Sequence, residues 1–123
     1  MRGEFVSVLS PEAWPFGLEW LPVPAYMVGG AVRDALLERR REYLDLDFVM
    51  PDGAVKTARA IARYYQAGFV LLDAERQIAR VVFKNATADF AKQEGETLEI
   101  DLHRRDFTIN AIAYNPHTQE LID

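Results

Sequence analysis

Residues 43–50 alternate between two kinds of side chain, as a β-strand with one buried face does. The apolar members of one face are Leu46, Phe48 and Met50. The other face carries Val49 and two carboxylates, those of Asp45 and Asp47. The pattern predicts a strand that anchors one face in a core and aims both carboxylates to the same side.

The segment before this strand predicts a strand, a turn and a helix. An apolar run at 25–28 reads as a buried strand that ends at Gly29-Gly30, and a helix follows over about 31–40. The helix positions expected to face the core are Val32, Leu36 and Leu37. Those expected on its polar sides are Arg33, Asp34, Glu38 and Arg39.

The segments after it predict a second helix and three more strands. The apolar stripe of the helix consists of Val55, Ala58, Ile61, Ala62 and Tyr65, and Asp52 is expected to cap its start. Strands are expected at 69–72, 79–84 and 86–90, with Asn85 in the tight turn between the last two. Residues 98–105 read as helical and 109–114 as apolar and buried. This order predicts an α+β fold, a small mixed sheet with helices on one face.

The chain of 123 residues has the size of one domain, and no linker divides it. We expect a single domain over 1–123 in which residues 1–25, rich in Pro and aromatics, form a cover with a short helix near 11–20. It contains no cysteine, which removes disulfides and thiolate metal sites. No signal peptide and no run of roughly 18 apolar residues is present, so we expect a cytoplasmic protein without a membrane partner.

The net charge of -5 differs from the basic excess typical of a self-sufficient nucleic-acid binder, because phosphate contacts supply most of the affinity of such proteins. Any binding of nucleic acid must then depend on a local basic surface or on contacts that this chain does not itself supply.

Gly29-Gly30 joins the first strand to the first helix. Two glycines allow a tight turn and a close approach of phosphate, and Arg33 lies about one turn into the helix, where its charge can reach the same phosphates. A plain strand-to-helix turn is the alternative, since glycine pairs mark turns generally.

The pair Asp45 and Asp47 predicts a metal site, because two close carboxylates repel unless a cation lies between them, and magnesium prefers oxygen ligands. The alternative is an exposed strand face with two solvated acids. Asp89, between apolar neighbours on a predicted strand, is either a third metal carboxylate or an edge-strand acid that faces water.

Residues 101–110 concentrate charge near the C-terminus. Arg104 and Arg105 are candidates to meet triphosphate oxygens, and Asp106 and Asn110, four apart, to contact ribose hydroxyls. The alternative is an internal Arg–Asp clamp. His103 reads as a surface or supporting residue, and His117 as a solvated surface residue.

Three segments together resemble one family. Residues 27–37 (MVGGAVRDALL), 45–48 (DLDF) and 104–111 (RRDFTINA) are similar in order and spacing to class II tRNA nucleotidyltransferases and bacterial poly(A) polymerases. The resemblance covers about 26–123 and implies the nucleotidyltransferase head of the DNA polymerase beta superfamily. The family's neck, body and tail domains, which choose the nucleotide and hold the tRNA, have no counterpart in this sequence.

The resemblance implies a function and the residues that perform it. Asp45 and Asp47 would hold Mg2+, and nucleotide contacts would come from a larger set: Gly29, Gly30, Arg33, Arg104, Arg105, Asp106 and Asn110. Asp89 matches only the general shape of the superfamily's third carboxylate. The implied reaction is magnesium-dependent transfer of CMP or AMP from CTP or ATP to the 3′ end of tRNA.

Two alternatives remain open from the sequence: a poly(A) polymerase head, which shares these motifs, and a nucleotide-binding module without turnover. The sequence does not specify which nucleotide is added, the oligomeric state, or whether the head acts alone.

Overall fold

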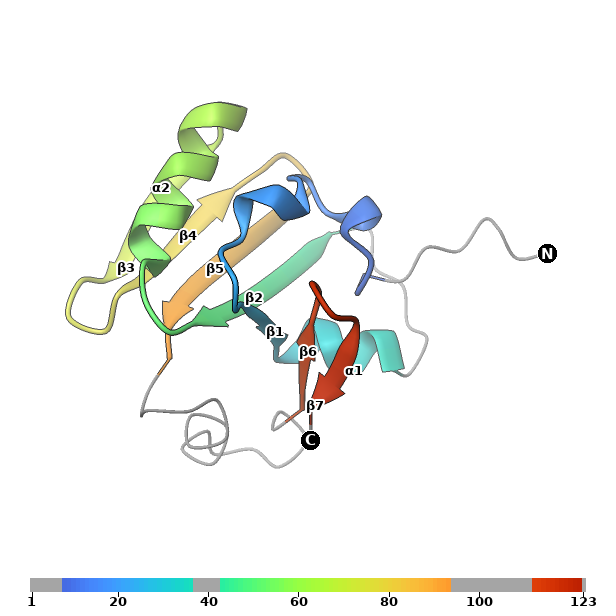
Figure 1. The fold of residues 1–123 in the computed structure, drawn as a ribbon. Coiled ribbons are helices and arrows are strands. Elements are labelled where there is room, and N and C mark those ends of the chain that lie inside the picture. The colour runs from blue at the N-terminus through green and yellow to red at the C-terminus, as the bar shows by residue number, and fades with distance from the viewer. Residues whose placement is uncertain (1–7, 37–42, 94–111, 123) are drawn as a thin grey trace.

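The computed structural model describes residues 8–36, 43–93 and 112–122, which form one mixed sheet with helices packed on it (Figure 1). The strands are β1 (Tyr26–Val28), β2 (Leu44–Met50), β3 (Gly68–Asp73), β4 (Ile78–Val82), β5 (Ala86–Lys92), β6 (Ala113–Asn115) and β7 (Glu120–Ile122). The helices are α1 (Gly30–Leu36) and α2 (Ala54–Tyr65), and two 3-10 turns precede them, η1 (Pro11–Ala13) and η2 (Leu18–Trp20). The predicted α+β class is confirmed.

The strand order is β3-β4-β5-β2-β1-β6-β7. The β2–β5 pair is parallel and the other pairs are antiparallel, so the sheet is mixed. The α2 helix is the crossover from β2, and the β3–β4 hairpin then leads to β5 beside β2. The tight turn expected at Asn85 is present, since Phe83 N–H donates to the Ala86 carbonyl at 2.8 Å.

One face of the sheet carries the main core. The fully buried sheet residues with the largest side chains on this face are Met27, Leu46, Phe48, Met50, Val81 and Phe90. Both helices contribute to the same cluster, α1 through Ala31 and Val32, and α2 through Ala58 and Ile61. The alternation that predicted the buried face of β2 is therefore confirmed.

The N-terminal cover is built from the two 3-10 turns rather than from the single short helix expected near 11–20. Pro11 begins η1, and Ser10 accepts a hydrogen bond from the Glu12 N–H. The cover is fixed by its aromatic side chains and by two long-range bonds. Trp14 Nε1 donates to the Val8 carbonyl at 2.7 Å, and Gly17 N–H donates to the Tyr65 hydroxyl at 3.0 Å.

Helix α1 is rotated relative to the expectation. Val32 is buried as predicted, but Leu36 is 44% exposed and Asp34, predicted on a polar side, is only 7% exposed. The buried positions Ala31 and Asp34 lie three apart, so the contact stripe runs along a different side of the helix from the apolar pattern. Leu37, Glu38 and Arg39 lie outside the described residues.

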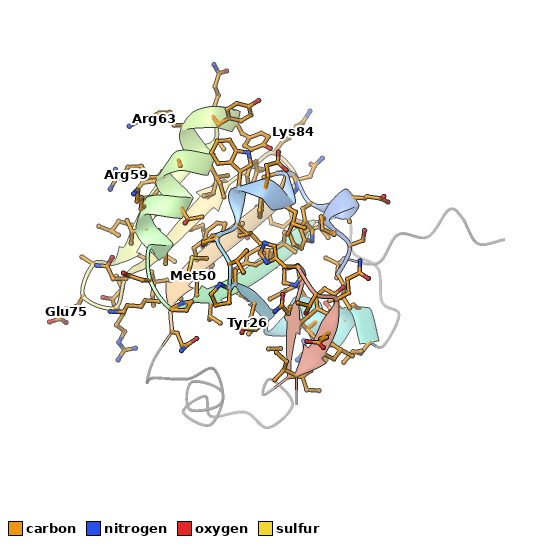
Figure 2. All side chains as sticks on the ribbon, viewed as in Figure 1. Tyr26, Met50, Arg59, Arg63, Glu75 and Lys84 are labelled. Carbon is orange, nitrogen blue, oxygen red and sulfur yellow. The ribbon has the colours of Figure 1, made fainter. Side chains whose placement is uncertain are left out.

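Helix α2 follows its predicted stripe, with Ala54, Ala58, Ile61 and Ala62 buried. Arg63 points away from the sheet on the outer side of the helix (Figure 2), whereas the Arg59 guanidinium lies over the Phe69 ring of β3, 4.5 Å from its centroid. Asp52 does not cap the helix, because its Oδ1 accepts from the Gly53 N–H at 2.9 Å and Gly53, at φ 77°, takes the N-cap position without a side-chain bond. Among the described helices, none has the length and apolar character needed to span a membrane.

We predict that Phe48→Ala lowers the free energy of unfolding by about 3–5 kcal/mol, because it leaves a large cavity in the core. The Phe48 ring stacks on Phe90 at 5.4 Å between centroids and meets Trp14 edge-on at 5.1 Å. Urea unfolding followed by tryptophan fluorescence measures the change. Tyr43→Ala, at a residue that is 46% exposed, is the control. A cost below about 1.5 kcal/mol for Phe48→Ala would show that the core collapses around the gap.

Candidate active site

The face of the sheet opposite the main core carries the predicted acidic residues. Parallel pairing of β2 with β5 sets Asp45 beside Thr87 and Asp47 beside Asp89. Paired residues on neighbouring strands point to the same face, so the three carboxylates of Asp45, Asp47 and Asp89 lie on one side of the sheet. The expectation that Asp45 and Asp47 share a face is confirmed, whereas their role in metal binding remains a prediction.

Asp47 lies against the Gly29-Gly30 turn. Val28, which precedes the turn, pairs with Asp47, and a Cβ added at Gly29 would lie 3.0 Å from Asp47 Oδ2. Gly29 also has a φ of +81°, which side-chain-bearing residues rarely adopt. Glycine is thus required at this position for two reasons, its backbone angle and the space that the Asp47 carboxylate occupies.

Asp45 is exposed and is oriented by its neighbour on β5. The Thr87 hydroxyl donates to Asp45 Oδ1 at 2.9 Å. This bond fixes the position of Oδ1. Because Asp45 is exposed, water or a cation can reach its other carboxylate oxygen, Oδ2. Thr87 was not singled out from the sequence, and its position opposite Asp45 follows only from the strand register.

Asp89 forms a two-pronged ion pair with Arg80 of β4. Arg80 Nε donates to Asp89 Oδ1 at 2.7 Å, and a terminal nitrogen donates to Oδ2 at 3.0 Å. The hydrogen bond from Arg80 to Asp89 and the charge of Asp89 raise the pKa of Arg80 above its ordinary value. Burial lowers this pKa by a smaller amount, and the charges of Asp47 and Asp45 raise it further. Asp89 is therefore not an edge-strand acid that faces only water, and its role as a third metal carboxylate stays a prediction.

Arg33 lies back over the Gly29-Gly30 turn. A Cβ added at Gly30 would be 3.5 Å from one of its terminal nitrogens, and its Nε is 4.0 Å from Asp34 Oδ1. The Nε atom is buried and makes no hydrogen bond to the part of the chain that the structure describes. The guanidinium is thus placed beside the turn where the sequence predicted a phosphate contact.

The carboxylates supply a donor set that suits a hard cation without enclosing it. Among the described residues, no three His, Asp or Glu side chains are grouped to hold a metal ion. Magnesium needs no such cage, since it is commonly bound through one or two carboxylates with water and substrate phosphates completing its shell. Asp45, which is exposed, and Asp47, on the same face beside a glycine turn, fit that mode of binding.

Of the other residues singled out from the sequence, the structure describes only His117. Arg104, Arg105, Asp106 and Asn110, with His103, fall outside the described residues, so their placement stays a prediction. His117 is half-buried rather than solvated, because its turn folds onto Asn115, whose Oδ1 accepts from the His117 backbone N–H at 2.9 Å. Its Nδ1 is buried without a hydrogen bond to any described residue.

Comparisons with known proteins agree on one family. The model of the poly A polymerase head domain matches residues 25–123. The chain is 67% identical over 109 residues to the CC-adding tRNA nucleotidyltransferase of Synechocystis sp., which covers 89% of this chain and 26% of that protein. It is 46% identical over 101 residues to the CC-adding tRNA nucleotidyltransferase of Geobacter sulfurreducens, covering 80% of this chain and 23% of that protein.

A solved structure shares the fold. A tRNA nucleotidyltransferase complexed with a primer tRNA and an incoming ATP analog superposes with a TM-score of 0.70 at 35% identity, over 81% of this chain and 31% of that one. The chain spans about a quarter of the length of the curated relatives it matches.

We predict that Gly29→Ala and Gly53→Ala differ in their effect on divalent cation binding. Both glycines have positive φ, so each substitution costs about 1–2 kcal/mol of stability from backbone strain. An added Cβ contacts Asp47 at Gly29 but meets nothing within 4 Å at Gly53. We therefore expect Gly29→Ala alone to weaken Mn2+ binding, by about threefold or more, because a binding group must be held within about 0.5 Å.

Thermal unfolding and Mn2+ titration followed by electron paramagnetic resonance measure the two effects. Equal Mn2+ affinity in the two variants would show that the Gly29 contact does not position Asp47.

Proposed function

The chain belongs to the family of poly A polymerase head domains, and from this premise we propose that it is the catalytic head of a tRNA nucleotidyltransferase that adds cytidines. In the reaction the 3′-hydroxyl oxygen of the RNA bonds to the α-phosphorus of CTP, the hydroxyl loses its proton, and pyrophosphate leaves. The observation that carries the proposal is the Asp47 carboxylate, which lies on the same sheet face as Asp45 and against the Gly29 turn. The description of both relatives as CC-adding supports CTP as the nucleotide in this proposal.

The triphosphate would lie beside the Gly29-Gly30 turn. The turn presents backbone without side chains there, and Arg33, directly above Gly30, offers a guanidinium to phosphate oxygens. The backbone angle at Gly29 keeps this approach open. Arg104 and Arg105 are proposed to hold further phosphate oxygens, and Asp106 and Asn110 the ribose.

Magnesium fits the acidic pair and is the proposed cofactor. Asp45 and Asp47 would hold it, with Thr87 fixing the orientation of Asp45 through the 2.9 Å hydrogen bond. When bound, the ion would neutralise charge on the phosphates and favour ionisation of the attacking hydroxyl. The contribution of the protein is positioning and electrostatic preorganisation, since both carboxylates are fixed by the sheet before substrate arrives.

The 3′ end of the RNA would approach the carboxylates from the β5 and β4 side, opposite the glycine turn, because the triphosphate occupies the β1 side. The strand order places Asp45 and Asp47 between these two sides. An in-line displacement needs this arrangement, with nucleophile and leaving group on opposite sides of the reacting phosphorus.

A second candidate is a nucleotide-binding module without turnover. The described part of the site, with its acidic pair beside a glycine turn, supports the binding of a cation and a triphosphate, which such a module needs. The net charge of -5 also disfavours unaided binding of a polyanion.

We predict that the chain incorporates labelled CMP into a tRNA that lacks its terminal CCA, and that incorporation stops after two residues. Asp47→Asn should reduce the rate by about a hundredfold or more, because it removes charge that faces the reacting phosphates. Asp52→Asn, at an exposed acid in the turn before α2, is the control and should leave the rate unchanged.

Incorporation of AMP alone would contradict the proposed cytidine addition and indicate an A-adding enzyme. Synthesis of a long A tail would indicate a poly(A) polymerase. Nucleotide binding without incorporation into any of these products would favour the binding module.

We predict that Arg33→Ala weakens CTP affinity in the presence of Mg2+ by about tenfold, because it removes a charge-assisted contact to phosphate. Calorimetry of the variant and the parent measures the change. Arg63→Ala, on the outer side of α2 (Figure 2), removes the same charge from a different face and should bind CTP as the parent does. Equal affinities for Arg33→Ala and the parent would make Arg33 a structural residue paired with Asp34.

A further inference from the structure

The sheet face that carries Asp45, Asp47 and Asp89, here called the acidic face, continues across β4 and β3. Arg80 of β4 pairs with Asp89, and Val70 of β3 pairs with Arg80, so one row of side chains crosses the sheet from Asp47 to Val70. Helices α1 and α2 pack in the main core on the opposite face. Along this row the acidic face changes from carboxylates to a cation and then to an apolar side chain.

Two exposed valines flank Arg80 on this face. Val70 lies directly opposite it on β3 and is 43% exposed, and Val82, two residues further along β4, is 38% exposed. Val82 pairs with Gly68, and a Cβ added at Gly68 would lie 3.4 Å from the Val82 Cβ. Because Gly68 has no side chain, Val82 stays open toward the edge of the sheet. The two valines thus offer apolar contact on either side of a cation.

Arg80 keeps hydrogen-bond donors for a second anion. Its bonds to Asp89, at 2.7 Å and 3.0 Å, use two of the five N–H groups of the guanidinium. The Arg80 side chain is 42% exposed, and it is the one basic side chain among the described strand residues of the acidic face. The pair with Asp89 also holds the guanidinium in a fixed orientation, so little further ordering is needed when an anion binds.

The position of Arg80 suits the RNA better than the triphosphate. Strand β4 lies two strands from β2, about 10 Å away at the usual strand spacing, whereas the Gly29-Gly30 turn adjoins the other side of β2. An RNA whose 3′-hydroxyl lies at Asp45 and Asp47 can therefore place its last phosphodiester at Arg80. Unpaired RNA ends are bound through their phosphates and through side chains that pack against the splayed bases.

We propose that Arg80, Val70 and Val82 form a docking surface for the 3′ end of the RNA, with Arg80 at the last phosphodiester and the valines at the adjoining nucleoside. The inference rests on the proposed function, because it takes the 3′-hydroxyl to react at Asp45 and Asp47. It also supplies a local basic contact to a polyanion in a chain whose net charge is -5.

The first test maps the contact on the unmodified 123-residue chain by nuclear magnetic resonance, which detects weak binding. Titration with a short single-stranded RNA that ends in a 3′-hydroxyl should shift the methyl signals of Val70 and Val82. Val23, 77% exposed in the N-terminal cover, is the matched control and should not shift. CTP with Mg2+ should instead shift the amide signals of Gly29 and Gly30.

Three results of this mapping would overturn the inference. The first is the absence of RNA-induced shifts at Val70 and Val82. The second is an equal shift at Val23, which would show non-specific contact. The third is a shift of the Val70 and Val82 methyls by CTP as large as that by RNA, which would assign the surface to the nucleotide.

The second test measures the affinity for the same RNA by fluorescence anisotropy at several salt concentrations. Arg80→Gln should weaken binding by about tenfold, equivalent to about 1.4 kcal/mol. It should also lower the slope of log affinity against log salt by about 0.7, the value for one phosphate contact to a single strand. Arg80→Lys keeps the charge and the slope but loses the planar fork, and should weaken binding by about threefold.

The valines are tested by the double variant Val70→Ser/Val82→Ser, which should weaken RNA binding by about threefold without changing the salt slope, because it removes apolar contact alone. Val23→Ser is its control. Arg76→Gln is the control for Arg80, since Arg76 has its own acidic partner, Asp73, at 4.0 Å in the same hairpin. An Arg80→Gln variant with the affinity and salt slope of the parent would also overturn the inference.

Failure of the proposed function would give a different result. If the chain incorporates no CMP while RNA still shifts the Val70 and Val82 methyls, the docking surface is supported and the proposed turnover is wrong. If CMP is incorporated and Arg80→Gln keeps the parent's KM for tRNA, only the docking surface is wrong.

Discussion

The parallel pairing of β2 with β5 is the contact on which the rest of the structure depends. It buries Phe48 and Phe90 in a ring stack on one face and sets Asp47 beside Asp89 on the other. Because side chains alternate along a strand, a slip of one residue would exchange these faces, placing carboxylates in the core and phenyl rings in water. The apolar burial that stabilises the sheet therefore also fixes the register of the charged residues.

The charged face is kept stable by specific partners for its acids. Thr87 donates to Asp45, Arg80 neutralises Asp89, and the Asp47 carboxylate lies where a glycine leaves room for it. Like charges this close would otherwise repel and destabilise the fold. Thr87 and Arg80 each come from a strand next to the acid concerned, so these two contacts form with the sheet itself.

Much of this arrangement could be predicted from the sequence. Alternation over 43–50 gave the two faces of β2, and the turn at Asn85 implies the pairing of Arg80 with Asp89, because counting outward from the turn sets the two opposite each other. The burial of Asp34 and exposure of Leu36 could not be predicted, since the rotation of α1 depends on what it packs against. The 3-10 turns were missed because aromatic anchors, rather than a helical apolar period, hold that segment. Composition gave no indication of Thr87, whose role depends on a strand distant in sequence.

The aromatic cover has a consequence for where this domain can be cut. The family match begins at residue 25, yet Trp14, Phe16 and Leu21 belong to the same core cluster as Phe48 and Phe90. Phe16 alone contacts four other aromatic rings, including Phe83 and Phe90. A recombinant fragment trimmed to the family boundary would expose the sheet's apolar face and invite aggregation. In this protein the packed unit extends further toward the N-terminus than the segment that the family match covers.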